Sequence, residues 1–237
     1  MTERTERSEG HEGMTSGYSM TERTERSEGM TSQYRAERTL VVVSAGLTRP
    51  SSTRLLADRL AAATVAAAGR DGDRVRVRVI ELRELAHDIT NHLLTGFAPA
   101  ALGDALEAVA SADALIAVTP IFSASYSGLF KSFFDVVEPE ALNGKPVLIA
   151  ATAGTARHSL ALEHALRPLF AYLGAVVVPT AVLAASDDWA GAQAQGPLRA
   201  RIDRAAGELA REMTRRETAA AVDPFTLTTS FEELLAG

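Results

Sequence analysis

Short apolar runs recur along the middle of the chain, each separated from the next by a longer polar or amphipathic segment. The runs predict strands at residues 39–43, 74–82, 115–119 and 145–152, and the start of a fifth strand at 175–178. The first is a continuous Leu-Val-Val-Val stretch, which is typical of a strand buried on both faces. The second alternates Arg with Val, which favours a position nearer the edge of a sheet.

The segments between these runs predict helices at residues 55–68, 99–110, from near Ser125, 158–173 and 189–217. Ser51, Ser52 or Thr53 is available to cap the first helix, because short hydroxyl side chains accept hydrogen bonds from helix N-termini. Residues 85–98 are less regular. The last helix has an early break expected near the Gly-Pro pair at 196–197.

Strands and helices alternate with short connections, which favours a parallel sheet covered by helices on both faces. The five expected strands fit an α/β fold of the flavodoxin-like type, a three-layer sandwich with a five-stranded parallel sheet of order 2-1-3-4-5. Ligands bind such sheets at the carboxyl edge, where the strand order reverses between the first and third strands. The loops after the first, third and fourth strands therefore form the candidate site.

The two ends of the chain differ from this alternating region. MTERTERSEG occurs twice near the N-terminus, at residues 1–10 and 20–29. A segment so rich in Thr, Glu, Arg and Ser buries too little apolar surface to offset its ordering entropy. We therefore expect a disordered tail at 1–37, one flavodoxin-like domain at 38–217 and a C-terminal tail at 218–237. Either Met20 or Met30 could be the true start.

Composition narrows the classes of partner. The formal net charge of −6 argues against nucleic acid, because phosphate binding favours a basic face. The absence of cysteine excludes disulfides, thiolate catalysis and cysteine–zinc sites. No apolar run approaches the roughly 18–20 residues of a membrane helix, and the N-terminus has no apolar signal core. We therefore expect a cytoplasmic protein without a membrane partner.

The loop after the first strand, residues 44–53, is rich in Gly, Pro and hydroxyl side chains. Backbone N–H groups at the start of the next helix, together with the helix dipole, form an anion site. Ser51, Ser52 and Thr53 add hydroxyl donors, and Arg49 adds charge. The loop is neither a Walker A motif nor a G-x-G-x-x-G fingerprint, and it suits the single phosphate of a mononucleotide. Simple N-capping by serine is the alternative interpretation.

In the loop after the third strand, Phe122 stands beside small residues at 123–125. Small side chains let the backbone approach a planar ring, so that main-chain N–H groups can hydrogen-bond to it. We expect this loop to contact a flat polar ligand; the alternative is that its aromatic residues only fill the core. Three phenylalanines recur at helical spacing: Phe130, Phe133 and Phe134. This spacing favours a role in the core or in a subunit contact.

The loop after the fourth strand offers close backbone approach at Gly154 and hydroxyl groups at Thr152 and Thr155. His158, just beyond, is either a ligand contact or a structural residue near a helix N-terminus. Three residues of types that bind metals lie close together in the sequence: His87, Asp88 and His92. We do not expect them to bind a metal, because the two histidines do not share one helical face.

Taken together, the three loops resemble those of the NADPH-dependent FMN reductases of the flavodoxin-like superfamily. The likeness covers roughly residues 39–216 and is strongest to the group that supplies reduced FMN to luciferase-like and alkanesulfonate monooxygenases. The family's G-S-x-R-x-x-S, T-P-x-Y-x-x-S-Y-S-G-x-x-K and A-T-x-G segments match residues 46–52, 119–131 and 151–154. His158 takes the place of the histidine that follows the last segment. The chain departs from the pattern at Leu47, which replaces a hydroxyl residue, and at Phe122, where tyrosine is common.

The resemblance implies that the first loop holds the phosphate of FMN and that the other two lie against its ring, with one face open for the nicotinamide of NADPH or NADH. The implied cofactor-binding residues are Leu47, Thr48, Arg49, Ser51, Ser52, Thr53, Pro120, Ile121, Phe122, Ser123, Ala124, Ser125, Thr152, Ala153, Gly154 and Thr155. No catalytic side chain is expected, because hydride transfer to a flavin needs orientation rather than a protein acid or nucleophile.

The resemblance also implies partners. The expected enzyme passes FMNH2 to a flavin-dependent monooxygenase, and it forms a homodimer or homotetramer through the helix from Tyr126 to Asp135. In related reductases the position of Tyr126 falls at a helix irregularity that is linked to tetramer contacts and to flavin transfer.

Two other functions remain open at this point. One is a quinone or azo-compound reductase that retains its FMN. The other is a flavodoxin-type electron carrier. The carrier is disfavoured because such proteins are strongly acidic and hold the ring between aromatic side chains, whereas aromatic residues make up only 5% of this chain.

Overall fold

The computed structural model describes residues 36–215, with the side chains of residues 191–195 left outside the description. The tails expected at 1–37 and 218–237 therefore lie outside the described residues, except for Ala36 and Glu37. Glu37 is the first residue of β1 (Glu37–Ser44), so regular structure begins one residue before the expected domain boundary.

The sheet has the order β2-β1-β3-β5-β6, which confirms the flavodoxin-like order expected for the five strands. Its parallel members are β1, β2 (Arg74–Glu81), β3 (Ala114–Phe122), β5 (Pro146–Ala153), β6 (Val176–Val177) and β7 (Val182–Ala185). A short strand, β4 (Ser125–Tyr126), pairs antiparallel with β3.

The fifth expected strand is in fact two pieces, because both β6 and β7 pair with β5. Pro179 lies between them and has no N–H to give to a strand ladder. The carboxylate of Glu208 accepts hydrogen bonds from the N–H and hydroxyl of Thr180, at 2.7 and 2.8 Å. The expected strand at 175–178 therefore covers only the first piece, and the second was missed.

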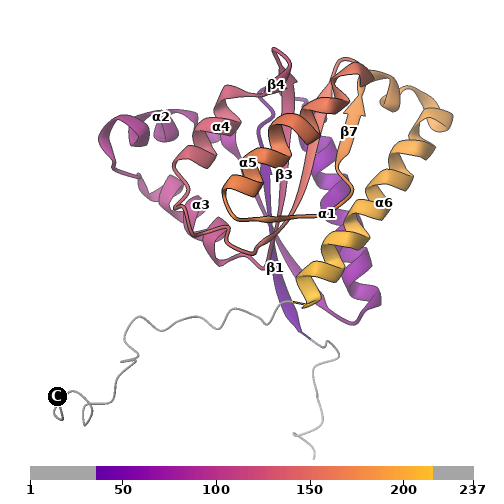
Figure 1. The fold of residues 1–237 in the computed structure, drawn as a ribbon, viewed down its shortest axis with the longest axis horizontal. Coiled ribbons are helices and arrows are strands. Elements are labelled where there is room, and N and C mark those ends of the chain that lie inside the picture. Colours follow the sequence, from indigo (N-terminus) through magenta and orange to yellow (C-terminus); the bar gives the residue numbers. More distant parts are fainter. Residues whose placement is uncertain (1–35, 216–237) are drawn as a thin grey trace, which may run out of the picture. The chain divides into compact units, whose positions relative to one another are not determined.

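Helices cover the sheet on both faces (Figure 1). One face carries α1 (Ser52–Arg70) and α6 (Gly191–Arg215). The other carries α2 (Ala86–Thr95), α3 (Ala100–Ser111), α4 (Gly128–Asp135) and α5 (Arg167–Tyr172). Alternate residues of β1 feed the two cores, Leu40 and Val42 on the α1 side and Val41 and Val43 on the other. Burial of this strand on both faces is as predicted.

Two helix predictions are wrong in detail. The last helix begins at Gly191 rather than 189, because Ser186–Trp189 form a 3-10 turn, η4. The break expected at 196–197 is absent, and Pro197 lies inside α6. Burial of Leu198, Ile202, Ala205, Leu209 and Met213 in the core beside α1 explains why the helix continues despite the missing N–H.

The other corrections concern local turns. The region at 85–98 contains the regular helix α2, which Gly96 ends in the left-handed conformation (φ 71°). The helix expected at 158–173 is divided into a 3-10 turn, η2 (Ala156–Ser159), a π-helix, η3 (Leu162–Leu166), and α5. A further 3-10 turn, η1 (Leu82–Glu84), follows β2.

Among the described residues, no single helix has the length and apolar character to cross a bilayer. Only α2 and α3 taken together meet that test, and they are bent by 90° at their junction. Both contribute buried residues to the core, among them Ile89, Leu102 and Val109.

Candidate active site

The three predicted loops meet at the carboxyl edge of the sheet. A cavity of about 230 Å³ is lined there by Ser52, Pro120, Ile121, Phe122, Thr152, Ala153, Gly154, Ala184, Ser186 and Trp189. We call this the central cleft. Its floor crosses three neighbouring strands, because Thr152 of β5 is in register with both Pro120 of β3 and Ala184 of β7. At about 4.8 Å between strands, that floor is about 10 Å wide.

A buried hydrogen bond joins the first loop to the third. The hydroxyls of Thr53, at the start of α1, and Thr152, at the end of β5, lie 2.8 Å apart, and both residues are buried. Thr53 therefore links the two walls of the site and does not itself line the central cleft.

Ser51 is the N-cap of α1, since its hydroxyl accepts a hydrogen bond from the N–H of Arg54 at 3.2 Å. The capping interpretation is thus confirmed for this serine. Gly46 leaves room for this cap, because a Cβ at that position would lie 2.1 Å from the Ser51 hydroxyl oxygen and would displace it. Ser44, at the end of β1, is 1% exposed, and its hydroxyl has no hydrogen-bond partner among the described residues.

The remaining first-loop residues face a different hollow. A cavity of about 390 Å³ is lined by Thr48, Arg49, Pro50, Ser51, Arg54, Leu55, Asp58, Glu81 and Arg83. Each of its arginines already has a carboxylate partner: Arg49 pairs with Glu84, Arg54 with Asp58 and Glu81, and Arg83 with Glu81. Hydrogen bonding to Asp58 is the main cause of the raised pKa of Arg54. Leu47 is half exposed and lines neither cavity.

The second loop is a β-hairpin, whereas the sequence predicted that a helix begins near Ser125. Phe122 pairs with Ser125 across a turn in which Ser123 and Ala124 both have positive φ, at 47° and 67°. This is the backbone of a tight primed turn, which matches the twist of paired strands. The helix begins only at Gly128. The hairpin leaves the ring of Phe122 half exposed beside the central cleft.

In the third loop, Gly154 lines the central cleft, and a Cβ there would meet no protein atom within 4 Å. Thr155 caps η2, with its hydroxyl accepting from the N–H of Arg157 at 3.4 Å. Neither Thr155 nor His158 lines the central cleft. The sequence therefore placed Thr152, Ala153 and Gly154 at the cleft and extended the loop beyond it.

The sequence interpretation missed the fourth wall of the central cleft. Ala184, Ser186 and Trp189 come from β7 and η4, which follow the undetected second piece of the fifth strand. The available signal was the apolar run at 181–185, followed at once by Ser-Asp-Asp-Trp. The indole of Trp189 is partly buried, and the guanidinium carbon of Arg59 lies 4.8 Å from its ring centroid.

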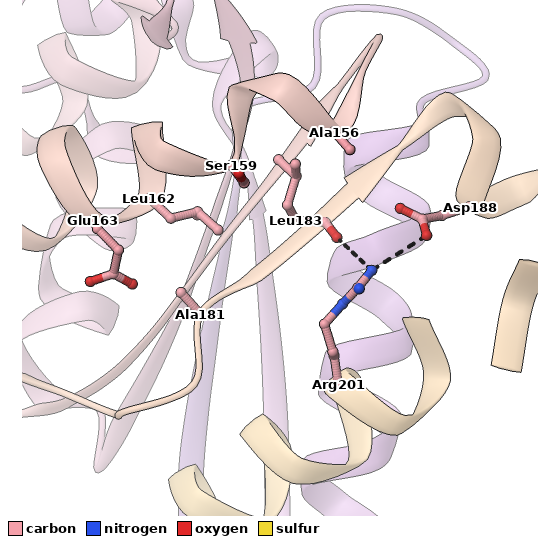
Figure 2. A pocket seen from close by; sticks show the side chains of 8 residues that line it. All are labelled: Ala156, Ser159, Leu162, Glu163, Ala181, Leu183, Asp188 and Arg201. Atoms are coloured by element: carbon pink, nitrogen blue, oxygen red, sulfur yellow. Dashed lines mark hydrogen bonds and ion pairs between the residues drawn. The ribbon is translucent and has the colours of Figure 1, made fainter. Parts of the chain in front are cut away.

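A third cavity, of about 390 Å³, lies on the outer side of β7 (Figure 2). In it Arg201 of α6 donates to the carbonyl of Leu183 at 3.3 Å and to Asp188 Oδ1 at 3.4 Å. The other oxygen of Asp188 accepts from the N–H of Ala185 at 2.8 Å. These bonds tie α6, β7 and η4 together. Glu163, on the same cavity, has a lowered pKa because Arg167 hydrogen-bonds to it.

The phenylalanines of α4 are core residues, as one of the two sequence interpretations held. Phe130, Phe133 and Phe134 are buried, and Phe134 packs against Phe170 with ring centroids 4.9 Å apart. Tyr126 lies in β4 and not at a helix irregularity, so that expectation is wrong. The helix irregularity in this part of the structure is the π-helix η3. Tyr126 and residues of η3 line the same hollow, which has a volume of about 440 Å³.

Among the described residues, none of the side chains that line the central cleft is ionisable. Its walls are apolar or hydroxyl-bearing, with backbone exposed at Gly154. Within the described residues no three His, Cys, Asp or Glu side chains are grouped to hold a metal ion. Such a cleft can hold a flat, largely apolar ring and orient it, and its described side chains offer hydroxyl groups but no ionisable acid or base.

Comparison with known proteins agrees with this geometry. The sequence model of the family described as NADPH-dependent FMN reductase matches residues 38–190. The chain is 40% identical over 178 residues to a Pseudomonas aeruginosa protein named FMN reductase (NADPH), covering 75% of this chain and 91% of that one. It is 39% identical over 168 residues to the NADH-dependent FMN reductase SfnF of Pseudomonas fluorescens, covering 70% and 87%.

Two solved structures of oxidoreductases are similar to the chain in sequence and fold. An oxidoreductase from Corynebacterium diphtheriae superposes with a TM-score of 0.74 at 48% identity, covering 76% of this chain and 99% of that one. The apo form of an NADH:FMN oxidoreductase, EmoB, has a TM-score of 0.62 at 32% identity, covering 71% and 88%.

Proposed function

The chain belongs to the NADPH-dependent FMN reductase family, and we propose that it transfers a hydride from NADPH or NADH to FMN and releases FMNH2 to a flavin-dependent monooxygenase. It is thus an NAD(P)H:FMN oxidoreductase. The observation that carries the proposal is the central cleft, in which the three loops meet around a floor without ionisable side chains. We propose both NADPH and NADH as hydride donors, because the relatives include an NADPH enzyme and an NADH-dependent enzyme.

The residues of the chain fit FMN. At the phosphate end, the start of α1 offers free backbone N–H groups and the hydroxyl of Ser52, and the unpartnered hydroxyl of Ser44 lies at the end of the adjoining strand. At the ring end, Phe122 and Gly154 present an aromatic face and open backbone. Bound FMN supplies a hydride acceptor at its N5 atom.

What the protein contributes to the reaction is orientation. The apolar side chains of the cleft present a surface against which a flat ring can be held. Backbone N–H groups of the second and third loops would stabilise negative charge on a bound, reduced ring. Hydride transfer leaves the reduced flavin one proton short of FMNH2, and that proton would come from solvent, because the described lining has no ionisable side chain.

Two observations support release of the reduced flavin. The central cleft is small, and the ring of Phe122 beside it is half exposed. A small cleft with an exposed ring beside it suits a flavin that enters and leaves as a substrate. We propose that a monooxygenase accepts the FMNH2, because the three loops resemble those of reductases that supply reduced FMN to such enzymes.

We also propose a cytoplasmic homodimer or homotetramer. The phenylalanines of α4 are committed to the core, so self-association would use the outer hollow between α4 and α5. That hollow is lined in part by Tyr126, His164 and Tyr172, and Tyr172 is 89% exposed. Analytical ultracentrifugation of wild type and Tyr172→Ser tests this: the variant should dissociate, and a wild-type monomer at micromolar concentration would contradict the proposal.

Steady-state oxidation of NADPH and NADH with added FMN, with and without a quinone, tests the reaction. Protein that purifies colourless and turns over with FMN alone supports the proposal. Yellow protein that turns over only with a quinone or azo compound would favour the FMN-retaining reductase. Stable one-electron reduction without NAD(P)H oxidation would favour an electron carrier.

A further inference from the structure

Two aromatic residues flank the floor of the central cleft from opposite sides. The strand β5 pairs with β3 along one edge and with β7 along the other. Phe122 is the last residue of β3, and Trp189 is the last residue of the turn that follows β7. Both line the cleft whose floor is the end of β5. The strand order therefore sets an aromatic side chain at each side of a floor about 10 Å wide.

The position of Trp189 is held by contacts on two elements. The cation–π contact with Arg59 of α1 holds one face of the indole. The preceding residue, Asp188, is bonded to the backbone of Ala185 and to Arg201 (Figure 2). A partly buried indole tied in this way loses little additional freedom when a ligand contacts it.

We propose that Trp189 contacts the flavin ring, as an FMN-binding residue of the fourth wall that η4 contributes. The inference rests on the proposed function, since it takes FMN as the ligand of the central cleft. An indole offers a large, rigid apolar surface with a π face, which suits a fused aromatic ring system. Trp189 thereby completes a site that the three loops leave open on the β7 side.

The experiment exploits the fact that the chain has a single tryptophan. Full-length apoprotein is titrated with FMN as wild type, Trp189→Phe and Trp189→Leu. FMN affinity and the fluorescence lifetime of the bound flavin are both measured. An indole in contact with an excited flavin gives it an electron and takes the electron back, which shortens the lifetime without net chemistry. Phenylalanine cannot act as this donor. Phe97→Leu, at an aromatic residue that is 71% exposed between α2 and α3, is the matched control.

Trp189→Leu should weaken FMN binding about tenfold, which corresponds to about 1.4 kcal/mol. Trp189→Phe should keep affinity within about twofold, because a ring still packs there. Both variants should lengthen the lifetime of bound flavin, while Phe97→Leu should change neither quantity. A purely structural tryptophan would leave the lifetime unchanged in Trp189→Phe, and that result overturns the inference. Wild-type protein that neither binds nor reduces FMN would instead contradict the proposed function, and the inference with it.

Discussion

Replacing Thr53 by Val should separate two walls of the central cleft at a measurable cost in stability. The substitution keeps the β-branched shape and removes the hydroxyl that lies 2.8 Å from the hydroxyl of Thr152. This bond joins residues 99 positions apart in sequence, the start of α1 and the end of β5. Both residues are buried, so the partner left behind has little access to water.

The magnitude follows from the two consequences of the change. Loss of one neutral hydrogen bond costs about 0.5–1.5 kcal/mol, and a buried hydroxyl left without a partner costs about 1–3 kcal/mol. Thr152 also lines the central cleft, where water can reach part of its surface, so the lower end applies. We expect a loss of about 1–2 kcal/mol in the free energy of unfolding. In a domain of this size that lowers Tm by about 2–8 °C.

Urea denaturation of apoprotein tests this with a double-mutant cycle of Thr53→Val and Thr152→Val. The double variant should be more stable than the sum of the single losses predicts, by about 1 kcal/mol, because neither hydroxyl is then orphaned. Thr64→Val is the matched control, since this buried α1 threonine bonds only to the carbonyl of Leu60 within its own helix. The reasoning would be refuted if the stability losses of Thr53→Val and Thr152→Val were additive in the double variant and each equalled the loss in Thr64→Val.

Of three further predictions, two concern the first loop and one concerns Glu163 of η3. Ser51→Ala should destabilise the protein by about 1 kcal/mol through loss of the α1 cap, whereas Ser51→Asn should restore most of it; equal melting curves for all three would contradict this. Gly46→Ala should displace the Ser51 hydroxyl and weaken FMN binding in a titration, while an unchanged dissociation constant would show that the loop tolerates a Cβ. Glu163 has a lowered pKa in the folded protein because of its hydrogen bond from Arg167, so its contribution to stability is present above the unfolded pKa and is lost as the pH falls through the folded one. Wild type should therefore lose its small advantage over Glu163→Gln in chemical denaturation below about pH 4, and a constant difference across pH would count against that assignment.

The sequence by itself determined the elements whose signals are local. The unbroken apolar run of β1 predicted a strand buried on both faces, and Leu40 to Val43 are fully buried. The serines before α1 predicted a cap, and Ser51 provides it. The alternation of strands and helices restricted the topology, because parallel strands need crossover connections of one hand. It also indicated the edge at which Ser52, residues 120–122 and residues 152–154 meet.

Tertiary pairing decided the rest, because its energy comes from residues far apart in the chain. Ser123 and Ala124 have no strong hairpin signal, yet they take positive φ where β4 pairs with β3. Pro197 reads locally as a break, but the buried face of α6 beside α1 outweighs one missing hydrogen bond. Trp189 enters the site only because β7 resumes pairing with β5, which brings Ala184 level with Thr152. No local pattern around the tryptophan specifies that register, and it is the register that gives the central cleft its fourth wall.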